Sequence, residues 1–186
     1  MPLAGKSILH VRRMWNDILW RQYSAALDML EAAMRACPDT LWCEPAEPRW
    51  NESGVVGFWY LAYHTLFFLD CYLSGSLKGF APPEPFSLDE IDPAGVLPER
   101  AYSKAELLAY LAHGREKCRA TLAALTEEKV AEVCEYPWLR LGFGELIVDN
   151  LRHVQHHTAQ MNLLLRQNVH AVPRWITTVD RTLQRS

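Results

Sequence analysis

Asn150-Leu-Arg-His-Val-Gln-His-His-Thr-Ala-Gln160 is the most informative stretch of this sequence. It carries three histidines within five residues, inside a segment over residues 143–167 whose apolar residues recur with the period of a helix. His153 and His157 are four residues apart, so on a helix they lie one turn apart on the same face. This spacing allows two imidazoles to bind one metal ion. A third candidate, His64, lies far upstream in the most apolar segment of the chain.

The orientation of the helix over 143–167 can be predicted from its leucines. We take Leu146 and Leu164, which are five full turns apart, as the inward direction. At about 100° per residue, the two spaced histidines lie about 20° to either side of that direction. His156 lies about 80° away, and Thr158 falls on the far side. The pattern therefore predicts two imidazoles in the middle of the apolar stripe, where leucine would be expected.

Three other segments have helical periodicity, with local signals at their ends. Cys37-Pro38 ends the first, because proline cannot continue the helical hydrogen bonds. Gly75 stops the second, and Ser103-Lys-Ala-Glu106 is a capping box that starts the third. The four helices are predicted over residues 7–36, 53–74, 104–125 and 143–167. They predict an all-α fold, a four-helix bundle, and the absence of repeats or linkers predicts one domain over residues 1–186.

Two connections are long. Residues 75–102 hold five of the eleven prolines and form a Pro-rich excursion between the second and third helices. A loop of this length inside a compact domain is either functional or wrapped over a surface. Residues 126–141 have extended character around 130–135, which indicates a short strand or hairpin.

The second helix is apolar on both faces, which is typical of a helix buried on both sides. Tyr60, Leu61 and Phe68 cluster around His64, and the opposite face carries Trp59, Ala62, Leu66, Leu69 and Leu73. Two explanations stay open at this point. One face is a subunit interface of a homodimer, or both faces are covered within the chain.

Composition excludes several classes of function. The net charge of −3 and the pI of about 6.2 argue against a general nucleic-acid binder, which would need a basic face. The longest apolar run, residues 54–69, is too short to span a membrane, and the N-terminus does not resemble a signal peptide. The five cysteines include no C-x-x-C pair, which favours reduced thiols in a cytoplasmic protein.

Three inward histidines favour a mononuclear metal site, because buried imidazoles cost stability unless they are hydrogen-bonded or bound to a ligand. Three histidines with one open position are the arrangement of a catalytic zinc site. Zinc, nickel, iron and copper all accept imidazole, so the residues do not choose among them. The alternative is a metal-free bundle with hydrogen-bonded core histidines. Neither an H-E-x-x-H motif nor the E-x-x-H pairs of di-iron bundles are present.

Several neighbours are candidates for supporting roles. Asp149 lies one turn before His153 and is either a carboxylate that orients it or a solvated charge, with Asn150 and Gln160 as weaker candidates. Tyr60 lies one turn before His64 and is either a proton donor or a packed core residue. Cys71 is interpreted as a small buried residue.

The histidine pattern resembles the DinB-like family of metal-binding four-helix bundles, which includes the YfiT-like proteins and bacterial thiol S-transferases. The resemblance rests on Tyr63-His64-Thr65-Leu-Phe-Phe-Leu-Asp70 and on the downstream His153-x-x-His156-His157-Thr-Ala-Gln160. The family's fourth-helix motif is commonly H-x-x-H-H-R-G-Q, and here Thr158-Ala159 replaces Arg-Gly. The likeness spans residues 7–168, and the Pro-rich excursion looks like the elaboration of one subgroup.

The resemblance implies that His64, His153 and His157 are the metal ligands, that His156 is not, and that the metal is nickel or zinc. It also implies a homodimer. Some members conjugate low-molecular-weight thiols to electrophiles, so we expect a metal-dependent enzyme, with thiol transfer in detoxification as the first hypothesis. A metal-dependent hydrolase and a non-catalytic, stress-related metal-binding dimer are the alternatives. The expected partner is a small molecule, and neither nucleic acid nor a membrane is expected.

Overall fold

The computed structural model describes residues 3–44, 57–170, 172–180 and 183 of the chain. In order, its elements are α1 (Leu3–Ala36), α2 (Asp39–Trp42), α3 (Phe58–Ser74), the 3-10 turn η1 (Asp89–Ile91), α4 (Lys104–Ala123), α5 (Glu127–Ala131), β1 (Val133–Tyr136), β2 (Leu139–Gly142) and α6 (Phe143–Val169). Most of the described chain is therefore helical, which confirms the predicted all-α class. No helix among these elements is long and apolar enough to cross a membrane.

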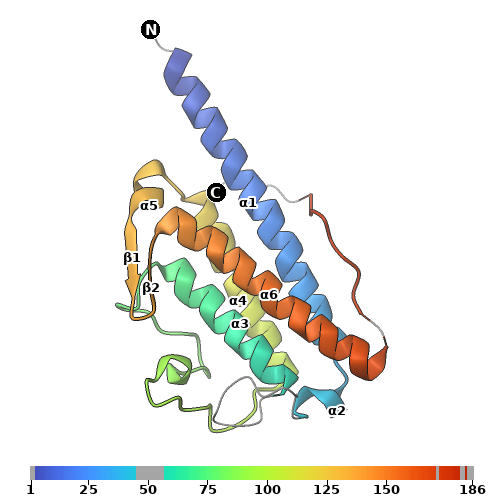
Figure 1. Ribbon diagram of the computed structural model, residues 1–186. Helices are drawn as coiled ribbons and strands as arrows, with labels where there is room; N and C mark the ends of the chain where they lie inside the picture. The colour runs from blue at the N-terminus through green and yellow to red at the C-terminus, as the bar shows by residue number, and fades with distance from the viewer. Residues whose placement is uncertain (1–2, 45–56, 171, 181–182, 184–186) are drawn as a thin grey trace.

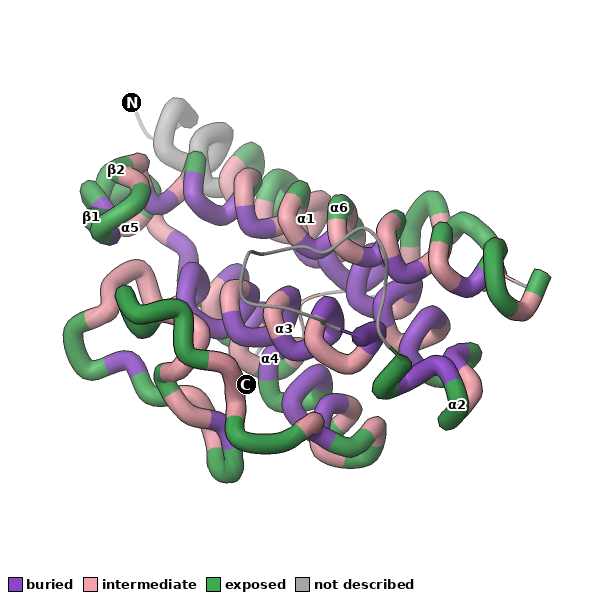
Figure 2. Tube along the Cα trace, turned by 60° about the horizontal axis from the view of Figure 1, so that its bottom comes forward, coloured by how far each residue is buried: buried purple, intermediate pink, exposed green. Residues whose placement is uncertain are grey.

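The four long helices α1, α3, α4 and α6 lie side by side (Figure 1). Helix α3 packs against α4 and α6, and α1 packs against the same two helices on the other side. Buried residues gather on the facing sides of these helices (Figure 2). The core is rich in aromatic and leucine side chains, and the largest fully buried ones include Tyr23, Tyr63, Tyr110, Phe58, Phe67 and Phe143.

The ends of α3 and α4 agree with the local signals in the sequence. Gly75 follows α3 with φ of 73°, a left-handed conformation that costs glycine little and lets the chain leave the helix. Ser103 caps α4 through a complete capping box with Glu106. The predicted cap of α3 at residues 51–53 lies outside the described residues.

The predicted extended segment near residues 130–135 lies slightly later, as a β-hairpin that follows α5. Strands β1 and β2 are antiparallel, with Val133 opposite Gly142 and Tyr136 opposite Leu139. The Tyr136 hydroxyl donates to the Cys71 carbonyl at 3.0 Å, which ties the hairpin to α3. The chain then enters α6 directly from β2.

The face of α3 opposite His64 is covered within the chain, whereas Tyr60, His64 and Phe68 on the other face are partly exposed. Ala62, Leu66 and Leu69 have no solvent exposure, and Leu73 is only 4% exposed. This face is therefore not available as a subunit interface, because the packing of α4 on α3 already buries it. Internal burial, the second explanation for an apolar helix, therefore holds for this face of α3.

Residues 75–103, which we call the Pro-rich segment, pack on α3 and α4 through aromatic rings. Phe86 is stacked on Tyr110 at 4.3 Å and on Tyr63 at 6.0 Å between ring centroids. Phe80 contacts Phe67 edge to face at 5.5 Å. The segment is thus attached to the helices at several points, and its turn η1 carries acidic residues toward α3.

Candidate metal centre

The packing of α3 against α6 brings three histidines together. The Nε2 atom of His153 lies 3.2 Å from Nε2 of His64 and 3.1 Å from Nε2 of His157. Nitrogen atoms of all three side chains lie within 4.8 Å of one another. These are the three residues that the sequence predicted as ligands, and they come from two helices, with His64 and His153 lying 89 positions apart in the sequence.

The position of the histidines on α6 differs from the prediction. The fully or nearly buried residues of this helix are Phe143, Leu146, Ile147, Asn150, Val154, Thr158, Met161 and Leu165. The buried stripe is therefore centred near Val154, and His153 and His157 lie partly exposed on its margin. Thr158, predicted on the far side, is buried and donates its hydroxyl to the Val154 carbonyl.

The physical reason for this difference is the place of α1. The Tyr23 hydroxyl of α1 donates to the Ile147 carbonyl at 2.6 Å, so α1 covers the Ile147 side of α6. Leu164, used to set the inward direction, is only half-buried. The helical periodicity of the sequence predicted the buried stripe of α6 to within one side chain of its actual position. The neighbouring helices decide where the centre of that stripe lies.

The distances in the triad fit a single bound cation. Imidazole nitrogens bind Zn²⁺ at about 2.0–2.1 Å, so two nitrogens at angles of about 90–110° around one ion lie about 2.8–3.4 Å apart. The two Nε2–Nε2 distances, 3.1 and 3.2 Å, lie within this range. Without an ion, three adjacent nitrogen atoms can share only the few protons that the rings carry. The donor set and its spacing therefore fit a divalent metal.

The second nitrogen of each ring has a different environment. His64 Nδ1 lies 2.5 Å from Oε1 of Glu90, and His157 Nδ1 lies 2.6 Å from Oε1 of Gln160. His153 Nδ1 is buried and has no hydrogen-bond partner among the described residues. Because carboxylate and amide oxygens accept, His64 and His157 carry their protons on Nδ1 and turn the Nε2 lone pairs to the centre of the triad.

The imidazoles of α6 are held in their neutral form. Burial, followed by the nearby His64, lowers the pKa of His153 to about 2. The same causes lower the pKa of His157 to about 4. Neutral imidazole is the form that binds metal ions, so these two side chains are available as ligands at neutral pH.

The structure shows which of the residues predicted to support the three histidines contact them. Gln160 contacts the triad, as anticipated, and its amide nitrogen also donates to His156, which points away from the centre. Asp149 does not orient His153, because its side chain is 39% exposed and pairs with Arg152 at 3.4 Å. It is a surface charge. Asn150 is buried but donates to the Leu69 carbonyl, so it joins α6 to α3 instead of supporting a ligand.

Tyr60 and Glu90 lie together beside His64. Burial, then the charge of Glu90 and a hydrogen bond to it, raise the pKa of the Tyr60 hydroxyl. The Tyr60 and His64 ring centroids are 6.3 Å apart. Sequence reasoning missed Glu90, because it belongs to the Pro-rich segment, where no periodicity indicates which side chain faces the helices.

Aromatic rings flank the other side of the triad. Phe68 lies 4.8 Å from His64 and 5.5 Å from His153 between ring centroids. Tyr72 lies 6.3 Å from His153 and accepts a hydrogen bond from Nε1 of Trp138, whose side chain is 44% exposed in a position next to Phe68. The histidines are thus bordered by Glu90 on one side and by an aromatic wall on the other.

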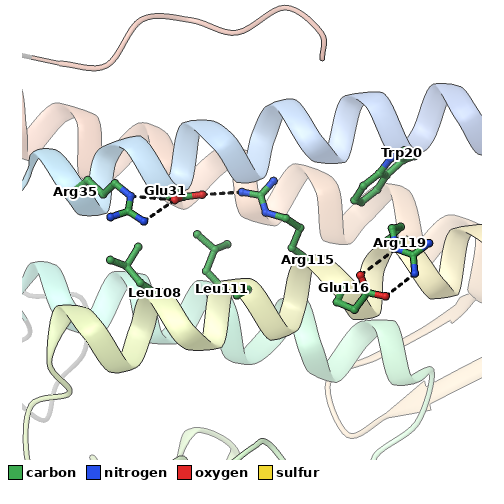
Figure 3. Close-up of a pocket in the computed structure, with 9 residues that line it drawn as sticks. Trp20, Glu31, Arg35, Leu108, Leu111, Arg115, Glu116 and Arg119 are labelled. Atoms are coloured by element: carbon green, nitrogen blue, oxygen red, sulfur yellow. Dashed lines mark hydrogen bonds and ion pairs between the residues drawn. The ribbon is translucent and has the colours of Figure 1, made fainter. Parts of the chain in front are cut away.

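Other cavities of the described chain lie away from the triad. A cleft of about 300 Å³ opens between α1 and α4, where Arg115 pairs with Glu31 at 3.0 Å (Figure 3). Arg115 also pairs with Asp28 of α1 at 2.7 Å. A second, apolar cavity of about 540 Å³ lies between α1, α5 and the start of α6. Neither has a histidine of the triad in its wall.

The fold and the site define a class: a helical protein with three converging histidines whose donor set fits a metal ion. The comparisons with known proteins agree: the family model of the DinB superfamily matches residues 22–161, well over half of the sequence. This chain therefore belongs to the DinB superfamily. The three-histidine cluster lies within the matched residues, on α3 and α6.

A solved structure shares the fold. A DinB-like protein of Bacillus subtilis, YjoA, aligns with a TM-score of 0.56 and 14% sequence identity, over 84% of this chain and 96% of its own. At this identity the likeness concerns the fold alone. A search of curated protein sequences finds no match.

Proposed function

We propose that His64, His153 and His157 hold one divalent metal ion, nickel or zinc. The observation that carries this proposal is the convergence of three Nε2 atoms, with separations of 3.1 and 3.2 Å, from two helices. The hydrogen bonds of Glu90 and Gln160 to the outer nitrogens supply the support that metal-binding histidines generally have.

We propose further that the centre is catalytic. The His64 side chain is 26% exposed, so a small molecule can reach the triad without unfolding of the helices. A divalent ion held by three neutral imidazoles would supply an uncompensated positive charge, which lowers the pKa of a coordinating thiol or water. The aromatic wall of Phe68, Tyr72 and Trp138 offers an apolar surface for the second reactant.

The reaction that suits this arrangement is transfer of a low-molecular-weight thiol to an apolar electrophile, as in detoxification. The thiol sulfur forms the new bond to the electrophilic carbon, and the thiol proton and any leaving group are released. The proposed partner is a small molecule, because the His64 side chain is only 26% exposed, and no nucleic acid or membrane partner is proposed. The five free cysteines fit a cytoplasmic location.

A non-catalytic metal-binding protein is the second candidate. It is favoured by the fact that the cavities between α1 and α4 and between α1, α5 and α6 are lined by other residues. In this case the ion would only fasten α3 to α6. A screen of the metal-loaded protein with thiols and a chromogenic electrophile, and with ester substrates for hydrolysis, separates the candidates. Metal-dependent turnover supports the catalytic proposal, and its absence with both substrate classes favours the second candidate.

The metal assignment has a matched internal control in His156. We expect His64→Ala, His153→Ala and His157→Ala to lose the bound metal in elemental analysis of the purified proteins. His156→Ala changes a neighbouring histidine that faces away from the triad, so it should keep a wild-type metal content. Equal metal content in His153→Ala, His157→Ala and the wild type would contradict the assignment.

We also propose that the long helices form a four-helix bundle whose Pro-rich segment is an elaboration of a subgroup, and that two copies form a homodimer. A candidate contact face surrounds the apolar cavity, where Val11, Trp15 and Val148 are 45%, 56% and 47% exposed. Sedimentation of the wild type and of Trp15→Lys tests this. A monomeric wild type contradicts the dimer, and a dimer that survives Trp15→Lys contradicts this face.

A further inference from the structure

We infer that Glu90 is the positioning residue of the three-histidine centre and that it couples the Pro-rich segment to the occupancy of that centre. The inference rests on the proposed metal-binding function and adds the regulation of the same site. It concerns a residue that lies outside the four long helices, in the turn η1.

The contact between Glu90 and His64 is short and shielded from water. Oε1 of Glu90 lies 2.5 Å from Nδ1 of His64, and the Glu90 side chain is only 4% exposed. A buried carboxylate is costly unless donors surround it. Here the Nδ1–H group of His64 donates to Oε1, and Tyr60 of α3 lies beside the carboxylate, whereas Oε2 is buried without a hydrogen-bond partner among the described residues. The carboxylate therefore fixes the tautomer of His64 and directs its Nε2 lone pair toward the triad.

Glu90 differs in two ways from the corresponding partner on α6. Gln160 is neutral and supports His157 from three positions away on the same helix, so α6 alone fixes that contact. Glu90 carries a negative charge and reaches His64 from 26 positions away in the sequence. The charge offsets part of the charge of a cation, which three neutral imidazoles leave uncompensated.

The contact between Glu90 and His64 also affects the Pro-rich segment. Apolar contacts of Phe80 and Phe86 hold the segment on the helices, whereas the contact of Glu90 with His64 is its polar attachment next to the triad. A cation that binds Nε2 of His64 withdraws electron density from the ring and makes Nδ1–H a stronger donor. Metal binding and attachment of the segment must therefore stabilise each other, because such coupling is reciprocal.

Zinc titration calorimetry and hydrogen exchange test this coupling. We expect Glu90→Gln, which keeps the shape and removes the charge, to weaken Zn²⁺ binding about tenfold or more. The matched control Glu99→Gln, at an exposed position of the same segment, should bind like the wild type. Zn²⁺ should slow amide exchange of residues 86–92 in the wild type and in Glu99→Gln, but not in Glu90→Gln.

The outcomes separate this inference from the proposed function. If the wild type and Glu90→Gln bind Zn²⁺ equally well, Glu90 does not position the centre, and the metal site itself stands. If the wild type binds neither Zn²⁺ nor Ni²⁺, the metal site and the coupling both fail. The positioning of His64 is then still measured in metal-free protein by ¹⁵N NMR. We expect one Nδ1–H tautomer in the wild type and a mixture in Glu90→Ala, and a mixture in the wild type would overturn the positioning role.

Discussion

Asp70 of α3 carries its carboxylate at a position with no solvent exposure. Lys117 of α4 forms a salt bridge with it, the Tyr110 hydroxyl donates to Oδ2 at 3.1 Å, and His113 lies 3.6 Å away. The ammonium group of Lys117 also donates to the hydroxyl of Ser74 at 2.6 Å. These contacts join α3 to α4 on the side of α3 away from α6, and no described cavity opens onto them. We interpret this network as structural.

The stability of this network gives a prediction at the scale of single residues. Lys117→Met should lower the free energy of unfolding by about 3 kcal/mol, because it leaves a buried carboxylate without its main counter-charge. Lys129→Met, which removes one member of the exposed pair with Glu132, should cost less than about 1 kcal/mol. Urea denaturation of both variants measures the difference. Equal, small losses would show that Asp70 does not depend on Lys117.

For single residues, the predictions made from the sequence also differed most in accuracy. The three histidines were identified because two have helical spacing and the third interrupts an apolar helix. Gln160 was a weak candidate because it lies within one turn of His157. Asp149 met the same sequence criterion and is nevertheless a surface charge, since the side of α6 that it occupies is turned to solvent. Spacing alone does not distinguish these two positions.

At the scale of elements, the start of α4 is the clearest case of a local signal that forms as predicted. The Ser103 hydroxyl accepts from the Glu106 backbone N–H at 3.2 Å, and the Glu106 carboxylate accepts from the Ser103 backbone N–H at 2.8 Å. Arg100 adds two further bonds to the same carboxylate, at 2.6 and 3.0 Å. The end of the Pro-rich segment is thus fastened to the first turn of α4.

This cap predicts a pH dependence of stability. Arg100, followed by the two groups of Ser103, lowers the pKa of Glu106 to about 2. Because the pKa in the folded state is lower than in the unfolded chain, the stabilisation is present above the unfolded pKa of about 4.5 and is lost as the pH falls toward 2. We expect Glu106→Gln to destabilise the protein at pH 6 and to approach the wild type at pH 2.5.

Denaturant unfolding across this pH range checks the cap. Glu99→Gln serves as the control, because it removes an exposed glutamate a few residues earlier. A constant difference between Glu106→Gln and the wild type from pH 6 to pH 2.5 would contradict the proposed role of the ionised carboxylate.

The boundaries of the elements follow a simple rule. Ends with a chemical signal agree with expectation: Cys37-Pro38 after α1, Gly75 after α3, and the capping box before α4. The hairpin lay a few residues away from its expected place, because its strands are short and Val130 belongs to α5 instead. Short elements depend on contacts with their neighbours, such as the bond from Tyr136 to α3, more than on their own periodicity.

At the scale of the whole molecule, the triad joins α3 to α6, and metal binding should therefore stabilise the entire fold. A ligand at a hundredfold excess over its Kd adds about 2.7 kcal/mol to the free energy of unfolding. For a chain of this size, that corresponds to a rise in Tm of about 5–10 °C. We expect Zn²⁺ to raise the Tm of metal-free protein by this amount and a chelator to reverse it.

Calorimetry of His157→Ala and His156→Ala provides the comparison. The first variant should show no shift in Tm with Zn²⁺, and the second should shift like the wild type. A wild type whose Tm responds to neither metal nor chelator would favour the metal-free interpretation of the three histidines.

The helices and the identity of the converging histidines could be inferred from the sequence, because both depend on short-range regularities. A period of 3.6 residues, a proline, a glycine or a capping box acts over one or two turns and is visible in a single chain. The all-α class and the candidate ligands follow from such signals, and so does the length of the Pro-rich segment.

Tertiary packing decided the features that depend on which elements meet. Helix α1 covers Ile147, so the buried stripe of α6 is centred near Val154 and not on the predicted line through Leu146 and Leu164. His153 and His157 therefore lie at the edge of this stripe. Burial within the chain of the α3 face opposite His64 removed one candidate interface. The contact of Glu90 with His64 joins residues 26 positions apart through an irregular segment. Such contacts have no sequence period, because the path of a loop is set by the surface on which it packs.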